Sequence, residues 1–284
     1  MSKIAVVTDS TTYLPAELVK QHNITIAPQV LIWGDQTYKD GVDITSEQFF
    51  TRLKTTKVMP TTSQVAVVSF EEIFQDLVKK DFEVLALLVS SKLSGTNQSA
   101  AQAKELMGPA GEKVHIVDSQ SVAMALGFQA LSVARAAEAG ASLKDCIALA
   151  EKSREHVGVI FAVDTLEFLH RGGRIGGAQR FLGTLLNMKP VLELREGRVE
   201  PVERVRTKGK ALERMLELVV ERVNGRTPVR LATLHANAAE EAKTVLERAV
   251  KALNPVESLF TAISPTVGTH TGPGTVGLTF MAGM

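Results

Sequence analysis

The segment that most constrains the fold is Val84–Ala100, VLALLVSSKLSGTNQSA, in which an apolar run stops abruptly at a loop rich in hydroxyl groups. The run from Val84 to Val89 is six residues long, which is too short to span a membrane and typical of a strand buried on both faces of a parallel sheet. Such a strand ends at the carboxyl edge of its sheet, where open α/β folds bind ligands. We therefore expect a ligand beside the loop that follows Val89.

Ser94, Gly95 and Thr96 lie in this loop, immediately before a predicted helix. Gly95 lets the backbone approach a ligand closely, and the N–H groups that open the helix favour a negative group. The loop is therefore predicted to form a small anion-binding cradle. The alternative is that Ser94 only caps the helix, as many serine residues do.

The composition permits a sizeable core, because 45% of the 284 residues are hydrophobic, enough for one large or two ordinary domains. A net charge of +1, with 22% charged residues, produces no overall field that would favour nucleic acid or an anionic membrane surface. Trp33 is the only tryptophan, which argues against a stacking platform for single-stranded nucleic acid. We expect no nucleic-acid partner.

A reducing, cytoplasmic location is predicted from the cysteine content and from the start of the sequence. Cys146 is the only cysteine, so no internal disulfide can form, and its place in a helical run indicates a buried structural thiol. The first residues, MSKIAVVTDS, lead almost at once into a predicted strand, without a long apolar segment or a small-residue cleavage site. No transmembrane segment is predicted.

Apolar strands alternate with helical stretches along the first part of the chain, which predicts a mostly parallel sheet with helices on both faces. After this part the sequence becomes locally basic, with ten Lys or Arg between residues 171 and 210 against four Glu. We predict an N-terminal α/β domain over residues 1–160 and a smaller C-terminal α/β domain over residues 161–284. The expected strands are Ile4–Thr8, an apolar run over Ile24–Trp33 that Pro28 breaks, Val84–Val89, Val114–Val117, Val157–Val163, a hairpin around Gly197, Val229–Leu234 and Val256–Ile263.

Two further stretches could bind an anion. Two guanidinium groups flank paired glycines in Arg171-Gly172-Gly173-Arg174. Each guanidinium group can bind a carboxylate or phosphate through two hydrogen bonds. Thr61-Thr62-Ser63 places hydroxyl groups in a polar loop at the start of a predicted helix. The alternatives are a solvated basic turn for the first stretch and ordinary N-capping for the second.

The stretch Gly268–Gly274, GTHTGPG, is predicted to be a tight, shaped loop, because it holds three glycines and a proline in seven residues. It places His270 between Thr269 and Thr271. A lone histidine is most often structural, but its place in a constrained loop favours a ligand-binding role for His270.

Several familiar chemistries have no signal in the sequence. It has no GxxxxGK[ST] phosphate loop, no GxGxxG after a strand and no GxSxG nucleophile elbow, so an ATP or dinucleotide enzyme is not indicated. No two of its histidines are spaced i,i+4, and no cysteine cluster could join them, so neither a metal site nor a cofactor is expected. The remaining candidate is a polar pocket that favours anions, with no set of catalytic residues.

The sequence resembles the DegV family in a series of motifs that follow the family's order over essentially the whole chain. The combination of LSGT, RGGRI and HTGPG makes the resemblance specific. After TTSQ many members continue with Pro-Ser, whereas Val65-Ala66 follow here. The motifs are TDST (8–11), TTSQ (61–64), SSKLSGT (90–96), VDS (117–119), LHRGGRI (169–175), Lys189-Pro190, Arg206-Thr207 and GTHTGPG (268–274).

The resemblance implies a two-domain DegV-like fold that encloses one palmitate- or oleate-like fatty acid in an apolar tunnel. It also implies similarity to FakB proteins, the fatty-acid-binding subunits of bacterial fatty acid kinase, which function in phospholipid synthesis. Such a subunit has no catalytic set of its own. It presents the bound carboxylate to a separate ATP-binding kinase subunit, and an acyltransferase would receive the acyl phosphate.

Carried over to this sequence, the resemblance implies two groups of site residues. The carboxylate would be bound by Thr62, Ser94, Gly95, Thr96, His270, Thr271 and Arg171. Arg174 and Arg206 would face the partner and the phosphate. The sequence does not single out the residues that line the tail, because many apolar residues are equally suitable for the core.

Burial of a sixteen-carbon tail would contribute roughly 11 kcal/mol before the loss of freedom on binding is subtracted. Two other function classes are compatible with the same residues. One is an enzyme that acts on a small carboxylated or phosphorylated metabolite with His270 as acid or base, and the other is a regulatory binding domain that the lipid only stabilises.

Overall fold

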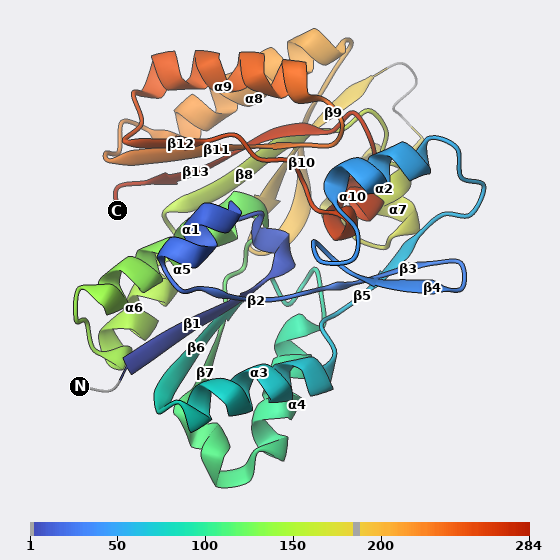
Figure 1. Ribbon diagram of the computed structural model, residues 1–284. Coiled ribbons are helices and arrows are strands. Elements are labelled where there is room, and N and C mark those ends of the chain that lie inside the picture. The colour runs from blue at the N-terminus through green and yellow to red at the C-terminus, as the bar shows by residue number, and fades with distance from the viewer. Residues whose placement is uncertain (1–2, 184–187) are drawn as a thin grey trace.

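A computed structural model describes residues 3–183 and 188–284, which form three β-sheets with helices packed around them (Figure 1). The first sheet is parallel throughout, with strand order β2-β1-β6-β7. Its central strand β6 is the predicted apolar run, and Val84 to Leu88 are fully buried. The strands are β1 Lys3–Asp9, β2 Thr25–Ala27, β6 Phe82–Leu88 and β7 Val114–Asp118.

Helices cover both faces of this parallel sheet, as the alternating pattern predicts, because its strands are apolar on both sides. One face packs against α3 Val67–Lys79 and α4 Thr96–Leu106, and the other against α5 Ala123–Glu138 and α6 Leu143–Ser153. The shorter helices nearby are η1 Ser10–Thr12, α1 Ala16–Gln21 and η2 Gly108–Lys113.

The second sheet has strand order β10-β9-β8-β13-β11-β12, and every neighbouring pair except β11 and β12 is antiparallel. Helices α8 Lys208–Val223 and α9 Ala239–Leu253 cover one face, and α5 packs against the other (Figure 1). The strands are β8 Val157–Ala162, β9 Lys189–Arg195, β10 Arg198–Val205, β11 Val229–His235, β12 Glu257–Leu259 and β13 Val276–Ala282.

The predicted division at residue 160 falls inside β8, whose two partners, β9 and β13, both belong to the second sheet. Because all of β8 belongs to the second sheet, the chain passes from the first large sheet to the second before Val157. The hairpin around Gly197 forms as expected, since β9 and β10 pair on either side of this glycine, which has a positive φ of 80°.

A small antiparallel sheet of order β4-β3-β5 lies beside the parallel one. In the aromatic core beside it, Trp33 packs against Phe49 with the two rings tilted by 57°, and the ring of Phe49 in turn meets Phe50 edge on. The C-terminal helix α10 packs against α2, α7 and β5, so a segment near the end of the chain completes this N-terminal region (Figure 1). The elements are β3 Val30–Trp33, β4 Gln36–Lys39, α2 Ser46–Leu53, β5 Thr61–Ser63, α7 Glu167–Arg171, η3 Gly176–Phe181 and α10 Pro265–Thr271.

Three local predictions differ from the structure. His270 lies in helix α10 rather than in a loop, because Ser264 caps this helix, Pro265 occupies its first turn, and the tight turn starts only at Gly272. Thr61–Ser63 forms strand β5 by pairing with β3. The strand expected over Val256–Ile263 is limited to Glu257–Leu259.

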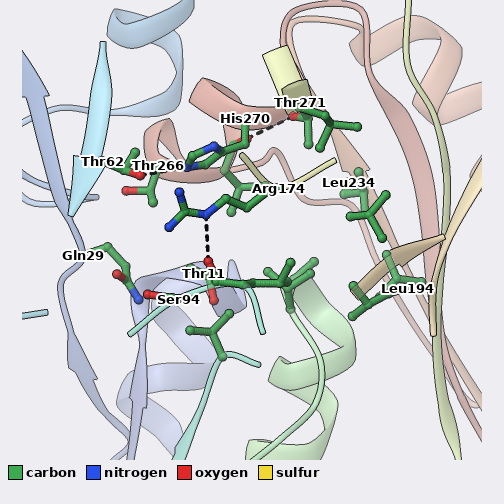
Figure 2. Close-up of a pocket in the computed structure, with 18 of the residues that line it drawn as sticks. Thr11, Gln29, Thr62, Ser94, Arg174, Leu194, Leu234, Thr266, His270 and Thr271 are labelled. Atoms are coloured by element: carbon green, nitrogen blue, oxygen red, sulfur yellow. Dashed lines mark hydrogen bonds between the residues drawn. The ribbon is translucent and has the colours of Figure 1, made fainter. Parts of the chain in front are cut away.

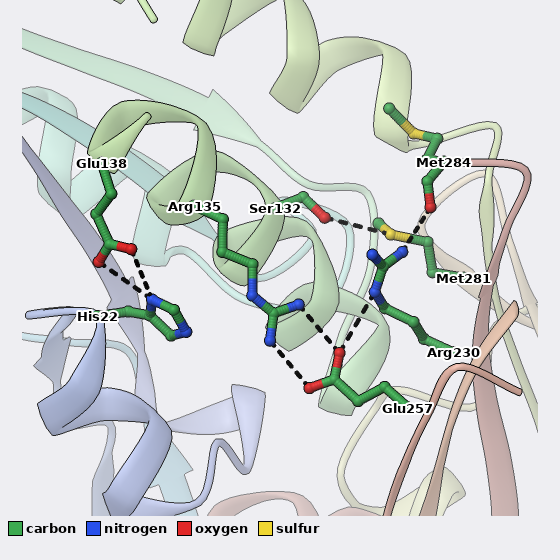
Figure 3. A network of polar contacts seen from close by, with 8 residues as sticks. All are labelled: His22, Ser132, Arg135, Glu138, Arg230, Glu257, Met281 and Met284. Carbon is green, nitrogen blue, oxygen red and sulfur yellow. Dashed lines mark hydrogen bonds and ion pairs between the residues drawn. The ribbon is translucent and has the colours of Figure 1, made fainter. Parts of the chain in front are cut away.

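A polar network joins helix α5, which packs against both large sheets, to strands β11 and β12 of the second sheet (Figure 3). Arg135 of α5 forms two hydrogen bonds of 3.0 Å with the Glu257 carboxylate, and Arg230 approaches the same carboxylate at 3.3 Å. Arg230 Nη1 also donates a hydrogen bond to the backbone oxygen of Met284. Nearby, His22 of the segment after α1 contacts Glu138 at 3.0 Å.

Candidate functional site

A cavity lies between the carboxyl edge of the parallel sheet and the inner face of the second sheet (Figure 2). It is narrow: the volume open to the centre of a water molecule is ≈ 90 Å³. Polar side chains line one end, and Leu194 and Leu234 lie at the other (Figure 2). Its remaining apolar lining comes from Val89, Leu93, Val122, Ala123, Val159, Phe161, Leu169, Val199 and Val267.

Thr62 and His270 meet at the polar end, although 208 residues separate them in the sequence. Thr62 Oγ1 and His270 Nε2 are 2.7 Å apart, which is a hydrogen bond. Strand β5 supplies the threonine, and the last turn of α10 supplies the histidine. The packing of α10 against β5 therefore creates this pair, which neither segment contains by itself.

Ser94 is held by a short chain of hydrogen bonds that starts at the carboxyl edge of the parallel sheet. Ser94 Oγ lies 2.8 Å from Thr96 Oγ1, which in turn accepts a hydrogen bond of 2.9 Å from Gln29 Nε2. Thr96 and Gln29 are buried, whereas Ser94 is half-buried and lines the cavity. The two buried residues therefore orient a serine hydroxyl that a ligand can reach.

Arg174 brings a positive charge into the polar end, between Thr62 and His270 on one side and Ser94 and Gln29 on the other (Figure 2). Its Nε donates a hydrogen bond of 2.9 Å to the backbone oxygen of Leu93, and its Nη1 donates one of 2.7 Å to that of Gly172. These bonds fix the guanidinium group in place. The polar end thus combines one cation with several hydroxyl groups, a set that suits a carboxylate.

Burial, and after it the nearby positive charge of Arg174, together lower the pKa of His270 from 6.5 to about 4. The imidazole is therefore neutral at neutral pH. A neutral ring can share a hydrogen bond with Thr62, but with this pKa it is a weak general acid or base. Among the described residues, no group of three His, Cys, Asp or Glu side chains is placed to hold a metal ion.

The apolar end is built by the strands of the second sheet, whose side chains alternate between its two faces. Val159 and Phe161 of β8 face the cavity, while Ile160 between them belongs to the core under α8 and α9. Gly277 of β13 leaves room here, since a Cβ atom would lie 2.7 Å from Cβ of Phe161. A long apolar chain therefore has a buried wall to lie against.

The carboxylate-site residues expected from the resemblance occupy different positions. Thr62, Ser94, His270 and Thr271 line the cavity together. Thr96 lies behind Ser94, and Gly95 lies under Gln64, whose side chain leaves no room for a Cβ atom.

The two arginines of the RGGR stretch lie in different surroundings. Arg171, expected at the carboxylate, is exposed and pairs with Glu167 one helical turn away at 2.6 Å. Arg174, expected at the partner surface, instead lines the cavity, because the chain turns at Gly173, whose φ is +68°. Arg206 is exposed, as a partner-facing residue would be.

Six polar lining residues are not among the site residues that the resemblance implies: Thr11, Tyr13, Gln29, Ser63, Gln64 and Thr266. Thr11 and Gln64 belong to motifs of the resemblance, Ser63 belongs to the candidate stretch Thr61-Thr62-Ser63, and a glutamine inside the apolar stretch Ile24–Trp33 is a signal for Gln29. Tyr13 and Thr266 had no distinctive local pattern. In the described ranges, 3–183 and 188–284, none of the helices is both long and apolar enough to cross a bilayer.

Comparison with known proteins finds relatives that match this chain over nearly its full length. The family model described as "Uncharacterised protein, DegV family" matches residues 3–283. A DegV domain-containing protein of Streptomyces coelicolor is 37% identical over 278 residues, which cover 97% of each chain.

Two solved structures share the fold. A DegV family protein from Thermus thermophilus, described as binding fatty acid, is 36% identical with a TM-score of 0.93, covering 99% of this chain and 100% of that one. A stearic-acid-binding protein from Eubacterium ventriosum is 25% identical with a TM-score of 0.91, covering 100% of this chain and 99% of that one.

Proposed function

This chain belongs to the DegV family, and we propose that it binds one long-chain fatty acid in the cavity between its two large sheets. The acyl tail would lie against the apolar strands of the second sheet, and the carboxylate would lie at the polar end. The observation that carries this proposal is the polarity of the cavity, with Thr62, Ser94, Arg174 and His270 at one end and buried apolar side chains at the other.

The different burial of the two ends of the cavity supports the proposed orientation of the fatty acid. Val159, Phe161 and Leu234 are buried, so a tail beside them would be removed from water. Thr62 and Ser94 are only half-buried, so the carboxylate keeps partial access to solvent. A charged head group is costly to bury without partners, and the hydroxyl groups and the guanidinium of Arg174 would supply them.

We further propose that the bound fatty acid is a substrate for a separate kinase subunit and that this chain has no catalytic set of its own. In that reaction a carboxylate oxygen attacks the terminal phosphorus of ATP, and acyl phosphate and ADP form. The half-exposed Thr62 and Ser94 would leave the carboxylate open to such a partner. The exposed Arg171 and Arg206 would contact the partner and favour the added phosphate, which an acyltransferase would then receive.

An enzyme with His270 as acid or base has less support. The pKa of His270 is about 4 because the ring is buried, and its Nε2 already contacts the Thr62 hydroxyl. A group with this pKa is almost fully deprotonated at neutral pH and would accept a proton poorly.

Native mass spectrometry of the purified protein tests the binding function, and we expect one fatty acid per chain. The delipidated protein should then gain thermal stability when palmitate or oleate is added, because a ligand that binds only the folded state stabilises it. Absence of both effects would refute the proposal. Acyl-phosphate formation with a kinase subunit and ATP separately tests the role as a substrate carrier.

A further inference from the structure

A second cavity lies behind the apolar end of the first, and Val159 and Leu194 line both of them. The second cavity has a volume of ≈ 210 Å³. Its lining is largely polar, since it also includes Gln120, Ser121, Arg154, Arg195 and Glu196. Val159 and Leu194 therefore lie between a largely apolar cavity and a largely polar one.

Leu194 is the last apolar residue of β9 before the turn of the hairpin. It is half-buried, whereas Leu192, two residues earlier on the same face, is fully buried. Leu194 lies at the end of the cavity opposite Thr62 and Gln29 (Figure 2). A fatty acid that lies with its carboxylate at the polar end would therefore point its methyl end at this side chain.

One loop connects the two ends of the cavity. Ser90 Oγ donates a hydrogen bond of 2.7 Å to the backbone oxygen of Gly197, and Lys92 Nζ donates one of 2.7 Å to that of Glu196. Both acceptors belong to the turn that directly follows Leu194 and Arg195. The same loop continues to Ser94 at the polar end, so it holds the turn beside Leu194 at a defined position relative to Ser94.

We propose that Leu194, together with Val159, forms an end wall that sets the longest acyl chain the protein accepts. This inference rests on the proposed fatty-acid function and adds a specificity determinant to it. Each methylene buried on the near side of the wall strengthens binding about fourfold. A carbon beyond the wall would either crowd the two side chains or enter the polar cavity, where it gains little burial.

The test measures dissociation constants of the delipidated full-length protein for saturated fatty acids of increasing length, from laurate to behenate. Affinity of the wild type should rise with chain length and then fall. In Leu194→Ala the optimum should move to longer chains by at least about two carbons, and the preference for long over short chains should increase at least about tenfold. Leu194→Phe should move the optimum to shorter chains.

Leu234→Ala is the matched control, because it removes the same atoms from the same end of the first cavity without bordering the second one. It should weaken binding of all lengths and leave the optimum unchanged. An unchanged optimal chain length in both Leu194 variants, or an equal shift of the optimal length in Leu234→Ala, would refute the proposed role of Leu194 as an end wall. If the wild type binds no fatty acid of any length, the proposed function itself fails. Val159→Ala provides a second opening variant should Leu194→Ala fold poorly.

Discussion

Arg171 and Arg174 show how strongly the role of a residue depends on its surroundings. Arg171 is exposed and paired with Glu167 on the surface of α7, an arrangement typical of a solvated helical ion pair. Arg174 is half-buried, and backbone oxygens of Leu93 and Gly172 hold its guanidinium at the polar end of the cavity. A charge held there contributes more to ligand binding than one in water.

Replacement of Arg174 by Gln should therefore weaken fatty-acid binding by about 10- to 100-fold, the effect expected when a hydrogen bond to a charged group is lost. Isothermal titration of the delipidated protein measures the effect. The matched control, Arg171→Gln, removes an equal charge three residues earlier and should change the affinity by no more than about twofold. A larger loss in Arg171→Gln than in Arg174→Gln would show that the carboxylate lies elsewhere.

At the scale of elements, the contact between α7 and α10 determines where His270 lies. Gly172 ends α7 with ordinary helical angles, φ −75° and ψ −6°, and the ring of His270 packs directly on it. A Cβ atom at position 172 would lie 2.0 Å from Nδ1 of His270, closer than any real contact. This glycine is therefore required by packing and not by its backbone conformation.

Gly172→Ala should displace His270 from Thr62. It should lower the free energy of unfolding by about 1–3 kcal/mol and also weaken fatty-acid binding. Gly173→Ala is the control next to it, because φ is +68° there and nothing lies within 4 Å of the added atom. It should cost about 1 kcal/mol of stability through backbone strain and leave the affinity intact. Thermal unfolding and a titration of each variant separate the two effects, and equal loss of affinity in both would contradict this role of Gly172.

At the scale of the molecule, the cavity exists because two sheets of different construction face each other. The parallel sheet contributes its loop-rich carboxyl edge, and the antiparallel part of the second sheet contributes an apolar face. Helix α5 packs against both, and its Arg135 joins the Glu257 carboxylate of β12 (Figure 3). Burial raises the pKa of Glu257, but Arg135 and Arg230 together hold it below its usual value.

Glu257→Gln should lower the free energy of unfolding by about 2 kcal/mol at neutral pH, since it leaves two partly buried guanidinium groups without their anion. The stabilisation by a carboxylate with a lowered pKa is present above its usual value of 4.5 and is lost as pH falls through the lowered one. The difference from wild type should therefore shrink on acidification. Urea unfolding of the delipidated proteins at several pH values measures it.

Glu138→Gln, on helix α5 close to Arg135, is the matched control, because Glu138 is exposed and its partner is His22. It should change stability by less than about 1 kcal/mol. Equal destabilisation by both variants would show that the junction between the sheets does not depend on the Glu257 carboxylate.

Local patterns in the sequence predicted much of the fold. The apolar run Val84–Val89 and the turn at Gly197 both depend on neighbours within a few residues, which is why sequence patterns reveal them. The same holds for the hydroxyl-rich loop around Ser94. These features establish a DegV-like α/β chain and several residues that line its cavity.

Tertiary structure alone decided how these pieces meet. Thr62 and His270 come together through the packing of α10 on β5, Arg174 rather than Arg171 enters the cavity because of one turn at Gly173, and Leu194 borders two cavities because a distant loop holds its hairpin. The physical reason is that hydrophobicity and propensity act along the chain over a few residues, whereas cavities arise from contacts between segments far apart. Sequence patterns therefore identify residues of such a site, but they do not show where in the cavity each of these residues lies.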